Sequence, residues 1–359
     1  MLFLWLWCAS PAPAVVLHDD GSQVPSGSRP VDAVMGRWVD NASCVAVGPS
    51  HVLTTIHQGY RIGSPVVLNG VEYRVAQTYN HPQADMRVAR LTLAGQPANL
   101  TDYAAIYHRT DEKTKTVVIG GFGMGRGDPL YSGPTPYGYE CIGNHNETLR
   151  WGANRVDNTS SRTVGDHYSY VLVSDFDATD VAYEASVGFY DSGGGWFVQD
   201  AGQWKLIGLT WTVQLHYEPG HEDDPEYSQS WFTPPDYMDA IRVSMYRDWI
   251  GRMVAGPHPG DANGDGAVNV SDLSTLANHF GQDNRPDWVE GNFNNDLVVD
   301  VLDLAILANN YGYLEGGAAG LDDSFPAGAP GDVVPEPATV SVLAVGILAS
   351  LLPRRHWRM

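Results

Sequence analysis

The chain has 359 residues, more than one average domain needs, and this length suggests two or three domains. It carries 42 acidic and 21 basic side chains, a formal net charge of −21. This balance argues against nucleic-acid binding, which relies on lysine and arginine to neutralise phosphates. With 43% hydrophobic residues the chain can bury a sizeable core. A soluble secreted surface and clustered calcium ligands both explain the acidic excess.

The first 14 residues have the features of a secretory signal. Leu2–Leu6 is apolar, and Ala12-Pro13-Ala14 fits the A-x-A pattern of a cleavage site. The polar residues 15–30 are rich in Gly, Pro and Ser, which predicts a flexible lead-in.

Three cysteines are present, and Cys8 falls within the signal. Cys44 and Cys141 would remain after its removal, and in an oxidising compartment they could pair. The sequence leaves both the paired and the free state open, because it does not show their separation.

Residues 31–213 alternate short β-rich runs with turns of Gly, Pro, Asn and Asp. The runs are Ser43–Val47, His51–Ile56, Pro65–Leu68, Glu72–Gln77, Met86–Leu93, Thr116–Ile119, Ser169–Val173, Trp196–Val198 and Lys205–Thr212. Many short strands at this spacing predict a barrel or a sandwich.

The next residues predict a change of structure. Residues 214–235 form a polar, acidic stretch that we expect to be a loop. Residues 236–254 then place an apolar side chain at every fourth position, which predicts a terminal amphipathic helix. These positions are Tyr237, Ile241, Met245, Trp249 and Met253.

The turn Tyr190-Asp191-Ser192-Gly193-Gly194 exposes a hydroxyl, and its glycines let the backbone take positive φ close to a substrate. A serine hydroxyl is a weak nucleophile that needs a base and a group to orient this base. His57 and Asp85 are the candidates, in one of the chain orders in which such triads occur. Taken singly, each of these residues is usually an ordinary part of a strand or loop, so the hypothesis depends on all three.

Five pieces in matching order resemble the trypsin/chymotrypsin-like serine proteases. They are Val52–His57, Asp85–Leu91, Tyr190–Gly194, Ile207–Trp211 and Arg242–Ile250. The resemblance covers roughly residues 31–254 and implies a mainly β, chymotrypsin-like double β-barrel with a C-terminal helix.

The resemblance also implies the roles of the site residues. Ser192 would attack a peptide carbonyl, His57 would carry the proton, and Asp85 would orient the imidazole, with no cofactor for catalysis. The backbone N–H groups of Tyr190 and Ser192 would bind the oxyanion. Tyr190 stands where the family has glycine, so a catalytically inactive protease fold that serves as a binding module is the alternative. No Ile/Val-Val-Gly-Gly start is visible, and we therefore do not expect a new amino terminus to pair with Asp191.

The same resemblance places a specificity pocket at Ser186, Thr210, Trp211 and Thr212. Ser186 falls where trypsin-like members carry the aspartate of the pocket floor, which argues against a Lys/Arg preference. Thr212 replaces a pocket-wall glycine and should narrow the pocket. We expect cleavage after small or medium apolar residues.

After a linker at 255–260, two related segments follow at 261–281 and 292–312. Both place oxygen ligands at the spacing of a calcium loop, with a backbone carbonyl at the seventh position. The ligands are Asp261, Asn263, Asp265, Ala267, Asn269 and Asp272 in the first loop and Asn292, Asn294, Asp296, Val298, Asp300 and Asp303 in the second. The second loop has Leu297 where the first has glycine, which predicts weaker binding. Asn/Asp-rich turns without metal are the alternative for both.

Each loop runs into a predicted short helix, Leu273–Phe280 or Leu304–Tyr311. Tandem loop–helix pairs with aspartate at the twelfth position resemble type I dockerins, which dock onto cohesin domains. The resemblance implies a small α-helical module at 261–312, a cohesin-type partner, and folding that depends on calcium.

The end of the chain begins with a Gly/Ala/Pro-rich linker at 313–333. Val334-Pro335-Glu336-Pro337, the apolar run Ala338–Leu352 and a basic end resemble the PEP-CTERM sorting signal, which exosortase-type enzymes read. The apolar run is shorter than the ~20 residues of a comfortable membrane span. A plain membrane anchor is the alternative.

Together these features predict a secreted or surface-attached bacterial serine endopeptidase that carries a dockerin and a sorting segment. The rival hypotheses are the inactive protease fold and a scaffold component whose main purpose is calcium-dependent assembly.

Overall fold

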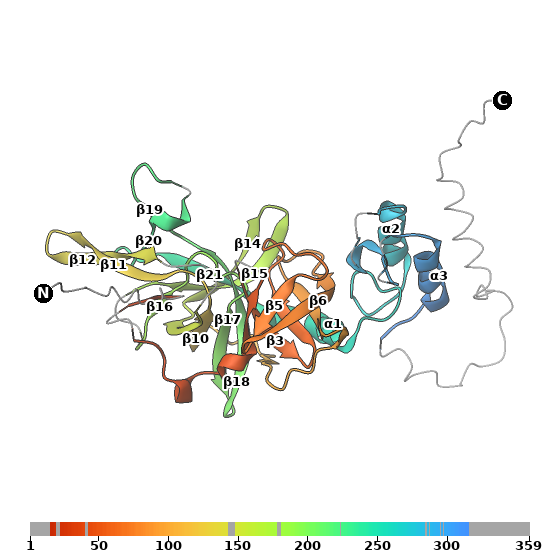
Figure 1. Ribbon diagram of the computed structural model, residues 1–359, viewed down its shortest axis with the longest axis horizontal. Helices are drawn as coiled ribbons and strands as arrows, with labels where there is room; N and C mark the ends of the chain where they lie inside the picture. Colours follow the sequence, from red (N-terminus) through yellow and green to blue (C-terminus); the bar gives the residue numbers. More distant parts are fainter. Residues whose placement is uncertain are drawn as a thin grey trace, which may run out of the picture. The chain divides into compact units, whose positions relative to one another are not determined.

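The computed structural model describes residues 15–18, 22–39, 42–142, 148–177, 181–222, 224–283, 286, 288–294, 296 and 298–315. The predicted signal, most of the 313–333 linker, and the sorting segment therefore lie outside the described residues. The described part is mainly β, with barrel-type sheets and few helices (Figure 1). The chain divides into two compact units between Val254 and Ala255.

The first half of the first unit is a sheet that closes on itself. Its strands are β2 (Met35–Trp38), β3 (Ala42–Gly48), β4 (His51–Thr54), β5 (Pro65–Leu68), β6 (Val71–Asn80), β7 (Arg87–Leu93) and β8 (Gln96–Pro97). They run in the order β4-β3-β2-β5-β6-β7-β8, and β4 also pairs with β7, which closes the barrel. Buried apolar side chains such as Trp38, Val52 and Leu91 fill its interior.

The second half of this unit is built on a larger sheet in the order β13-β10-β17-β18-β21-β15-β14, with β9 paired to β18. The bounds are β9 (Ala105–Ile106), β10 (Thr116–Gly121), β13 (Arg150–Arg155), β14 (Asn158–Val164), β15 (His167–Asp175), β17 (Gly195–Asp200), β18 (Gln203–Val213) and β21 (Tyr237–Arg242). A second core packs on it, around Trp196, Leu172 and Ile207.

Two smaller sheets complete the unit. One has the order β11-β12-β20-β19, from β11 (Gly125–Ser132), β12 (Thr135–Ile142), β19 (His216–Tyr217) and β20 (Ser228–Trp231). The other pairs β1 (Val16–Leu17) with β16 (Ala185–Ser186). Short 3-10 turns lie at Ser26–Ser28, Asp32–Val34, Pro225–Tyr227 and Val243–Tyr246.

All nine predicted β-rich runs fall on strands or overlap them, but the predicted lead-in at 15–30 is wrong for its first residues. Val15, Val16 and Leu17 are 0–2% exposed and belong to the core. Val16 pairs with Ser186 and Leu17 with Ala185, so this segment is held by a strand that precedes the serine turn. The sequence did not indicate this strand, because its apolar run is only three residues long and polar residues follow it.

The predicted helix at 236–254 is also wrong in its first half. Tyr237–Arg242 is strand β21, between β15 and β18, and only Arg247–Ala255 forms the helix α1. Four consecutive residues, Met238–Ile241, are buried, as expected of a strand with neighbours on both sides. A spacing of four places side chains on one face of a strand as well as of a helix, so the pattern fitted both. Within the predicted loop at 214–235 lie β19 and β20.

Cys44 and Cys141 are free, buried thiols. Cys44 packs in the core of the first barrel, whereas Cys141 packs with Phe176 and Phe232 in a different cluster. Burial raises the pKa of the Cys141 thiol to about 12.

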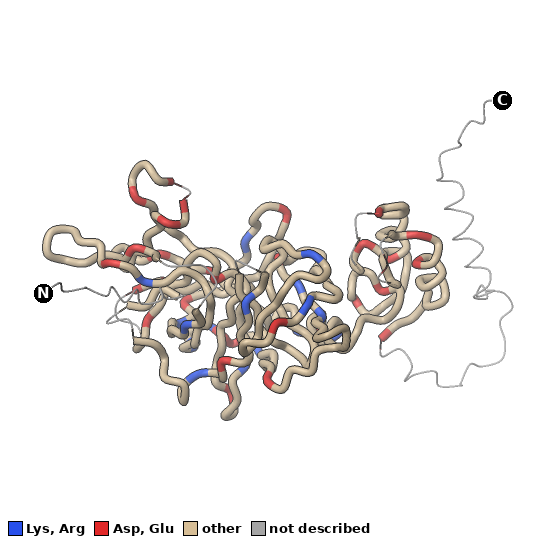
Figure 2. Tube along the Cα trace, viewed as in Figure 1, with Lys and Arg blue, Asp and Glu red and all other residues tan. Residues whose placement is uncertain are grey.

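The second unit consists of two loop–helix pairs. Its helices are α2 (Val270–His279) and α3 (Val301–Asn310), with a 3-10 turn at Trp288–Glu290. Both helices begin about three residues before the predicted ones. Among the described residues of this unit the charged side chains other than histidine are all acidic, as Figure 2 shows.

Candidate active site

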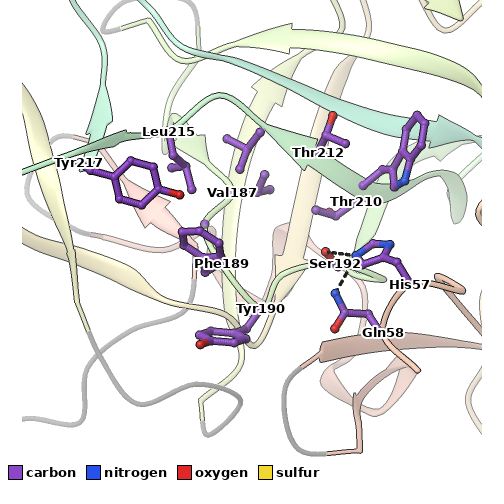
Figure 3. A pocket seen from close by; sticks show the side chains of 13 residues that line it. His57, Gln58, Val187, Phe189, Tyr190, Ser192, Thr210, Thr212, Leu215 and Tyr217 are labelled. Atoms are coloured by element: carbon purple, nitrogen blue, oxygen red, sulfur yellow. Dashed lines mark hydrogen bonds between the residues drawn. The ribbon is translucent and has the colours of Figure 1, made fainter. Parts of the chain in front are cut away.

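The structure brings His57, Asp85 and Ser192 together at one site. Figure 3 shows His57 beside Ser192. His57 follows the end of β4 and Asp85 lies just before β7, so the β4–β7 pairing places them side by side. His57 Nδ1 lies 2.6 Å from Asp85 Oδ2, and His57 Nε2 lies 3.1 Å from Ser192 Oγ. These contacts form a continuous hydrogen-bonded chain from carboxylate to hydroxyl.

The Asp85 carboxylate accepts four hydrogen bonds. Its Oδ1 accepts from the backbone N–H groups of Ile56 at 2.7 Å and His57 at 3.0 Å. Its Oδ2 accepts from His57 Nδ1 and, at 2.8 Å, from the indole N–H of Trp211. Burial alone would raise the pKa of Asp85, but the hydrogen bonds and charge of His57 and the Trp211 bond outweigh it and lower the pKa to about 2. Asp85 is therefore ionised at neutral pH and holds His57 with its proton on Nδ1.

The serine turn has a special backbone. Tyr190 has a φ of +70° and Gly193 a φ of +80°. The left-handed conformation is costly for a tyrosine, and strain of this kind is concentrated at functional sites. At Gly193 a Cβ atom would lie 2.1 Å from the Ser43 carbonyl oxygen, so only glycine fits there.

One buried serine of the first barrel contacts this turn and its surroundings. The Ser43 N–H donates to the Ser192 carbonyl at 2.9 Å, and Ser43 Oγ accepts from the Phe122 N–H at 3.0 Å. The Ser43 carbonyl accepts from the Thr54 hydroxyl at 2.8 Å. The serine turn is thus bonded directly to strand β3 as well as to its own sheet.

The buried Asp191 side chain holds the serine turn in place through hydrogen bonds to backbone N–H groups. It is 1% exposed and accepts hydrogen bonds from the N–H groups of Gly188, Gly123 and Val15. Burial raises the pKa of Asp191 to about 7, and these three bonds only partly oppose it. The Val15 bond comes from a backbone N–H inside the chain, and the expectation that no new amino terminus pairs with Asp191 stays a prediction.

A pocket of about 510 Å³ opens beside Ser192 and His57. Thr210, Trp211 and Thr212 line it, as the resemblance implied, but Ser186 is not among its lining residues. Ser186 is 1% exposed, donates to the Val187 carbonyl, and pairs with Val16. Apolar side chains that the sequence did not indicate make up much of the wall. Figure 3 shows Val187, Phe189, Leu215 and Tyr217, and Val213 lines the pocket as well.

Gln58 is another residue whose contact with His57 the sequence did not indicate. Its side-chain Nε2 lies 2.7 Å from His57 Nε2, the same atom that faces Ser192 Oγ (Figure 3). A neutral imidazole has one acceptor nitrogen, so the Gln58 amide and the Ser192 hydroxyl compete for one lone pair.

In the second unit, buried carboxylates organise the two loops. Asp261 accepts from the N–H groups of Gly264, Asp265 and Gly266, and Asp272 accepts from Ala262, Asn263 and Asn269. Asp303 repeats the Asp272 pattern with Phe293, Asn294 and Asp300. Asn269 and Asp300 also cap α2 and α3 with their side chains.

One observation bears on whether these loops fit a cation. Asn292 is 2% exposed, and its Oδ1 has no hydrogen-bond partner in the described part of the chain. A buried oxygen without a donor is a suitable ligand for a hard cation. Within the described ranges no group of three or more His, Cys, Asp and Glu side chains is gathered to hold a metal, so a calcium site would need the asparagine and carbonyl oxygens too.

Elsewhere in the loops, Asn263 Nδ2 donates to Asp265 Oδ2 and Asn294 Nδ2 to Asp296 Oδ2, both at 2.9 Å. The N–H groups of Ala267 and Val298 donate to Asp265 and Asp296. Leu297 lies outside the described residues. Among the residues that are described, no helix is long and apolar enough to cross a membrane.

Comparison with known proteins adds little to this geometry. No known family matches the sequence, and no curated protein is similar to it. Among solved structures, the chain is similar to the inactive form of the Rv3671c protease, with 11% identity and a TM-score of 0.39, over 64% of this chain and 96% of that chain.

Proposed function

We propose that the first unit is a serine endopeptidase with a chymotrypsin-like double β-barrel fold. The observation that supports this most is the position of His57, between Asp85 on Nδ1 and Ser192 on Nε2. The three residues come from distant parts of the chain, and an accidental meeting in this order and at hydrogen-bond distances is improbable.

In the proposed reaction, Ser192 Oγ attacks the peptide carbonyl carbon while His57 Nε2 takes the hydroxyl proton. Asp85 stays ionised and stabilises the imidazolium. The N–H groups of Tyr190 and Ser192 stabilise the oxyanion of the tetrahedral intermediate. His57 then gives its proton to the leaving amine, and water releases the acyl group by the same steps in reverse.

The substrate that fits the pocket has an apolar side chain before the cleaved bond. Val187, Phe189, Val213 and Leu215 line the pocket, and its described lining residues include no Lys, Arg, Asp or Glu. We therefore propose cleavage after apolar residues. A peptide library digested mainly after Arg and Lys would contradict this preference.

Covalent labelling tests the proposed activity. A fluorophosphonate probe should label the wild-type protein, and the label should be lost in Ser192→Ala and His57→Ala. Ser132→Ala, at an exposed serine of β11, is the matched control and should label fully. A folded wild-type protein that takes no label would favour the alternative of an inactive protease fold that serves as a binding module.

We further propose that removal of residues 1–14 completes the serine turn. Cleavage after Ala14 would make Val15 the amino terminus, and the Val15 nitrogen already donates to the buried Asp191 carboxylate. The α-ammonium would convert this hydrogen bond into an ion pair beneath Ser192. Amino-terminal sequencing of the secreted protein should begin at Val15, and a start elsewhere would exclude this route.

For the second unit we propose calcium binding and a cohesin-type partner. The duplicated loop spacing supports a cation at each loop, and the buried Asn292 oxygen supports one at the second loop. The ligands would be Asp261, Asn263, Asp265, Ala267, Asn269 and Asp272 in the first and Asn292, Asn294, Asp296, Val298, Asp300 and Asp303 in the second. Excess chelator should unfold residues 260–312 but not the protease unit, as followed by far-UV circular dichroism, and a cohesin pull-down should require calcium.

The proposed location is the bacterial cell surface or the outside of the cell. The PEP-CTERM-like segment from Val334 onward would be read by an exosortase-type enzyme. Cell fractionation tests this, because a chain that ends before Val334 should appear in the medium instead of the envelope.

A further inference from the structure

Trp211 touches two parts of the site at once. It lies in β18 of the second sheet, is 4% exposed, and its indole N–H donates to Asp85 Oδ2 of the first barrel at 2.8 Å. The same side chain lines the pocket beside Ser192. The resemblance to serine proteases implied only its place in the pocket.

The bond from Trp211 completes the set of hydrogen bonds that hold the Asp85 carboxylate. Backbone N–H groups of Ile56 and His57 hold Oδ1. Besides His57 itself, Trp211 is the side-chain donor that holds Oδ2 among the described residues. With both oxygens bonded in this way, the carboxylate cannot rotate without breaking a hydrogen bond to a charged group, which is stronger than a neutral one.

We propose that Trp211 is a positioning residue of the triad, which holds Asp85 in register with His57 and links that carboxylate to the occupancy of the pocket. This inference rests on the proposed protease function. A substrate side chain that packs in the pocket presses on the ring whose N–H holds Asp85. Binding energy from the pocket is thereby used at the reacting centre, where it raises kcat and not only affinity.

Trp211→Phe tests the proposal because it keeps an aromatic ring in the pocket and removes the N–H. We expect kcat to fall about tenfold with KM within about twofold, since one hydrogen bond to a charged group is lost. The acid limb of the kcat–pH profile should move to higher pH by about half a unit, because Asp85 then presents a less shielded charge to His57. The ratio of kcat values between substrates with an apolar side chain and with glycine before the cleaved bond should shrink.

Trp151→Phe is the matched control. Trp151 is 1% exposed and its indole N–H donates to Asp32 Oδ1 at 2.8 Å, away from the triad. This variant should leave kcat and the pH profile unchanged, even where its melting temperature falls. A Trp211→Phe enzyme with the kcat and pH profile of wild type would overturn the proposal.

A spectroscopic measurement separates this inference from the proposed activity. The low-field proton resonance between His57 Nδ1 and Asp85 should move in Trp211→Phe whether or not the protein hydrolyses peptides. Should Trp211→Phe not fold, the wild-type Trp211 indole resonance decides, because it should shift as His57 titrates. If the indole resonance does not change when His57 is protonated, the proposal that His57 and Trp211 share Asp85 Oδ2 is contradicted.

Discussion

Asp85 in the first unit and Asp261 in the second are both buried carboxylates that accept backbone hydrogen bonds, yet their pKa values move in opposite directions. Burial opposes ionisation of both. At Asp85 it is outweighed by His57 and Trp211, and the pKa falls to about 2. At Asp261 burial dominates, neighbouring aspartates add to it, and the pKa rises to about 6. Backbone donors alone therefore do not offset burial, whereas a side chain that can become charged does.

Asp191 shows that the difference depends on the partner and not on the unit. It lies in the first unit, next to Ser192, but its donors are backbone N–H groups and its pKa rises to about 7. Asp85 already has its side-chain partners, His57 and Trp211, within the chain. We propose that Asp191 and the loop carboxylates receive theirs later, from a processed amino terminus and from calcium.

The largest expected effect comes from removing the charge of Asp85. Asp85→Asn should lower kcat by about 10⁴-fold, because a neutral amide no longer holds His57 with its proton on Nδ1. The fold should persist, since the backbone bonds to Oδ1 can remain. Steady-state kinetics measure the loss, and a fall of less than tenfold would contradict the proposed role.

Removal of one loop carboxylate is the next test. Asp272→Ala takes away the acceptor for three backbone N–H groups and one proposed calcium ligand. We expect calcium to raise the melting temperature of the wild-type second unit by more than about 10 °C, and this gain to be lost in the variant. Asp283→Ala, at an exposed aspartate of the same unit, should keep it. Equal responses of the two variants would argue against the first loop as a calcium site.

A smaller effect concerns Asp191 and the amino terminus. Its folded pKa of about 7 lies above the ordinary 3.8, so in a chain that extends before Val15 it lowers stability as pH rises from about 4 to about 7. In a chain that starts at Val15, the α-ammonium group of Val15 should lower the pKa of Asp191 and remove this loss of stability. Melting temperatures between pH 4.5 and 8 compare the two, with an acetylated Val15 chain as control. Identical pH profiles would exclude the ion pair.

The smallest effect is expected at Gln58. Gln58→Met removes the donor that competes with Ser192 for His57 Nε2, and a neutral hydrogen bond corresponds to about fivefold in rate. The rate of fluorophosphonate labelling should rise by that factor. Gln203→Met, at an exposed glutamine, should label at the wild-type rate. Slower labelling of Gln58→Met would mean that Gln58 assists the base.

Some of this site could be predicted from the sequence because its residues lie in local patterns. His57 ends a β-rich run and Ser192 lies in a glycine turn, so the residues next to each of them in the sequence already indicate its role. The Trp211–Asp85 bond and the Val15–Asp191 contact join segments more than 100 residues apart, and no local pattern encodes them. The pocket wall at Val187 and Leu215 was missed for the same reason, and β21 was mistaken for a helix because a period of four fits both structures.

Ser43 joins the two halves of the first unit. Its backbone and hydroxyl bond to Ser192, Thr54 and Phe122, and Gly193 packs against its carbonyl without room for a side chain. If heat separates the first barrel from the second sheet, the bond between Ser43 and Ser192 must break as well. If the unit has the proposed activity, its thermal inactivation should follow the separation of its two halves and not the unfolding of their cores.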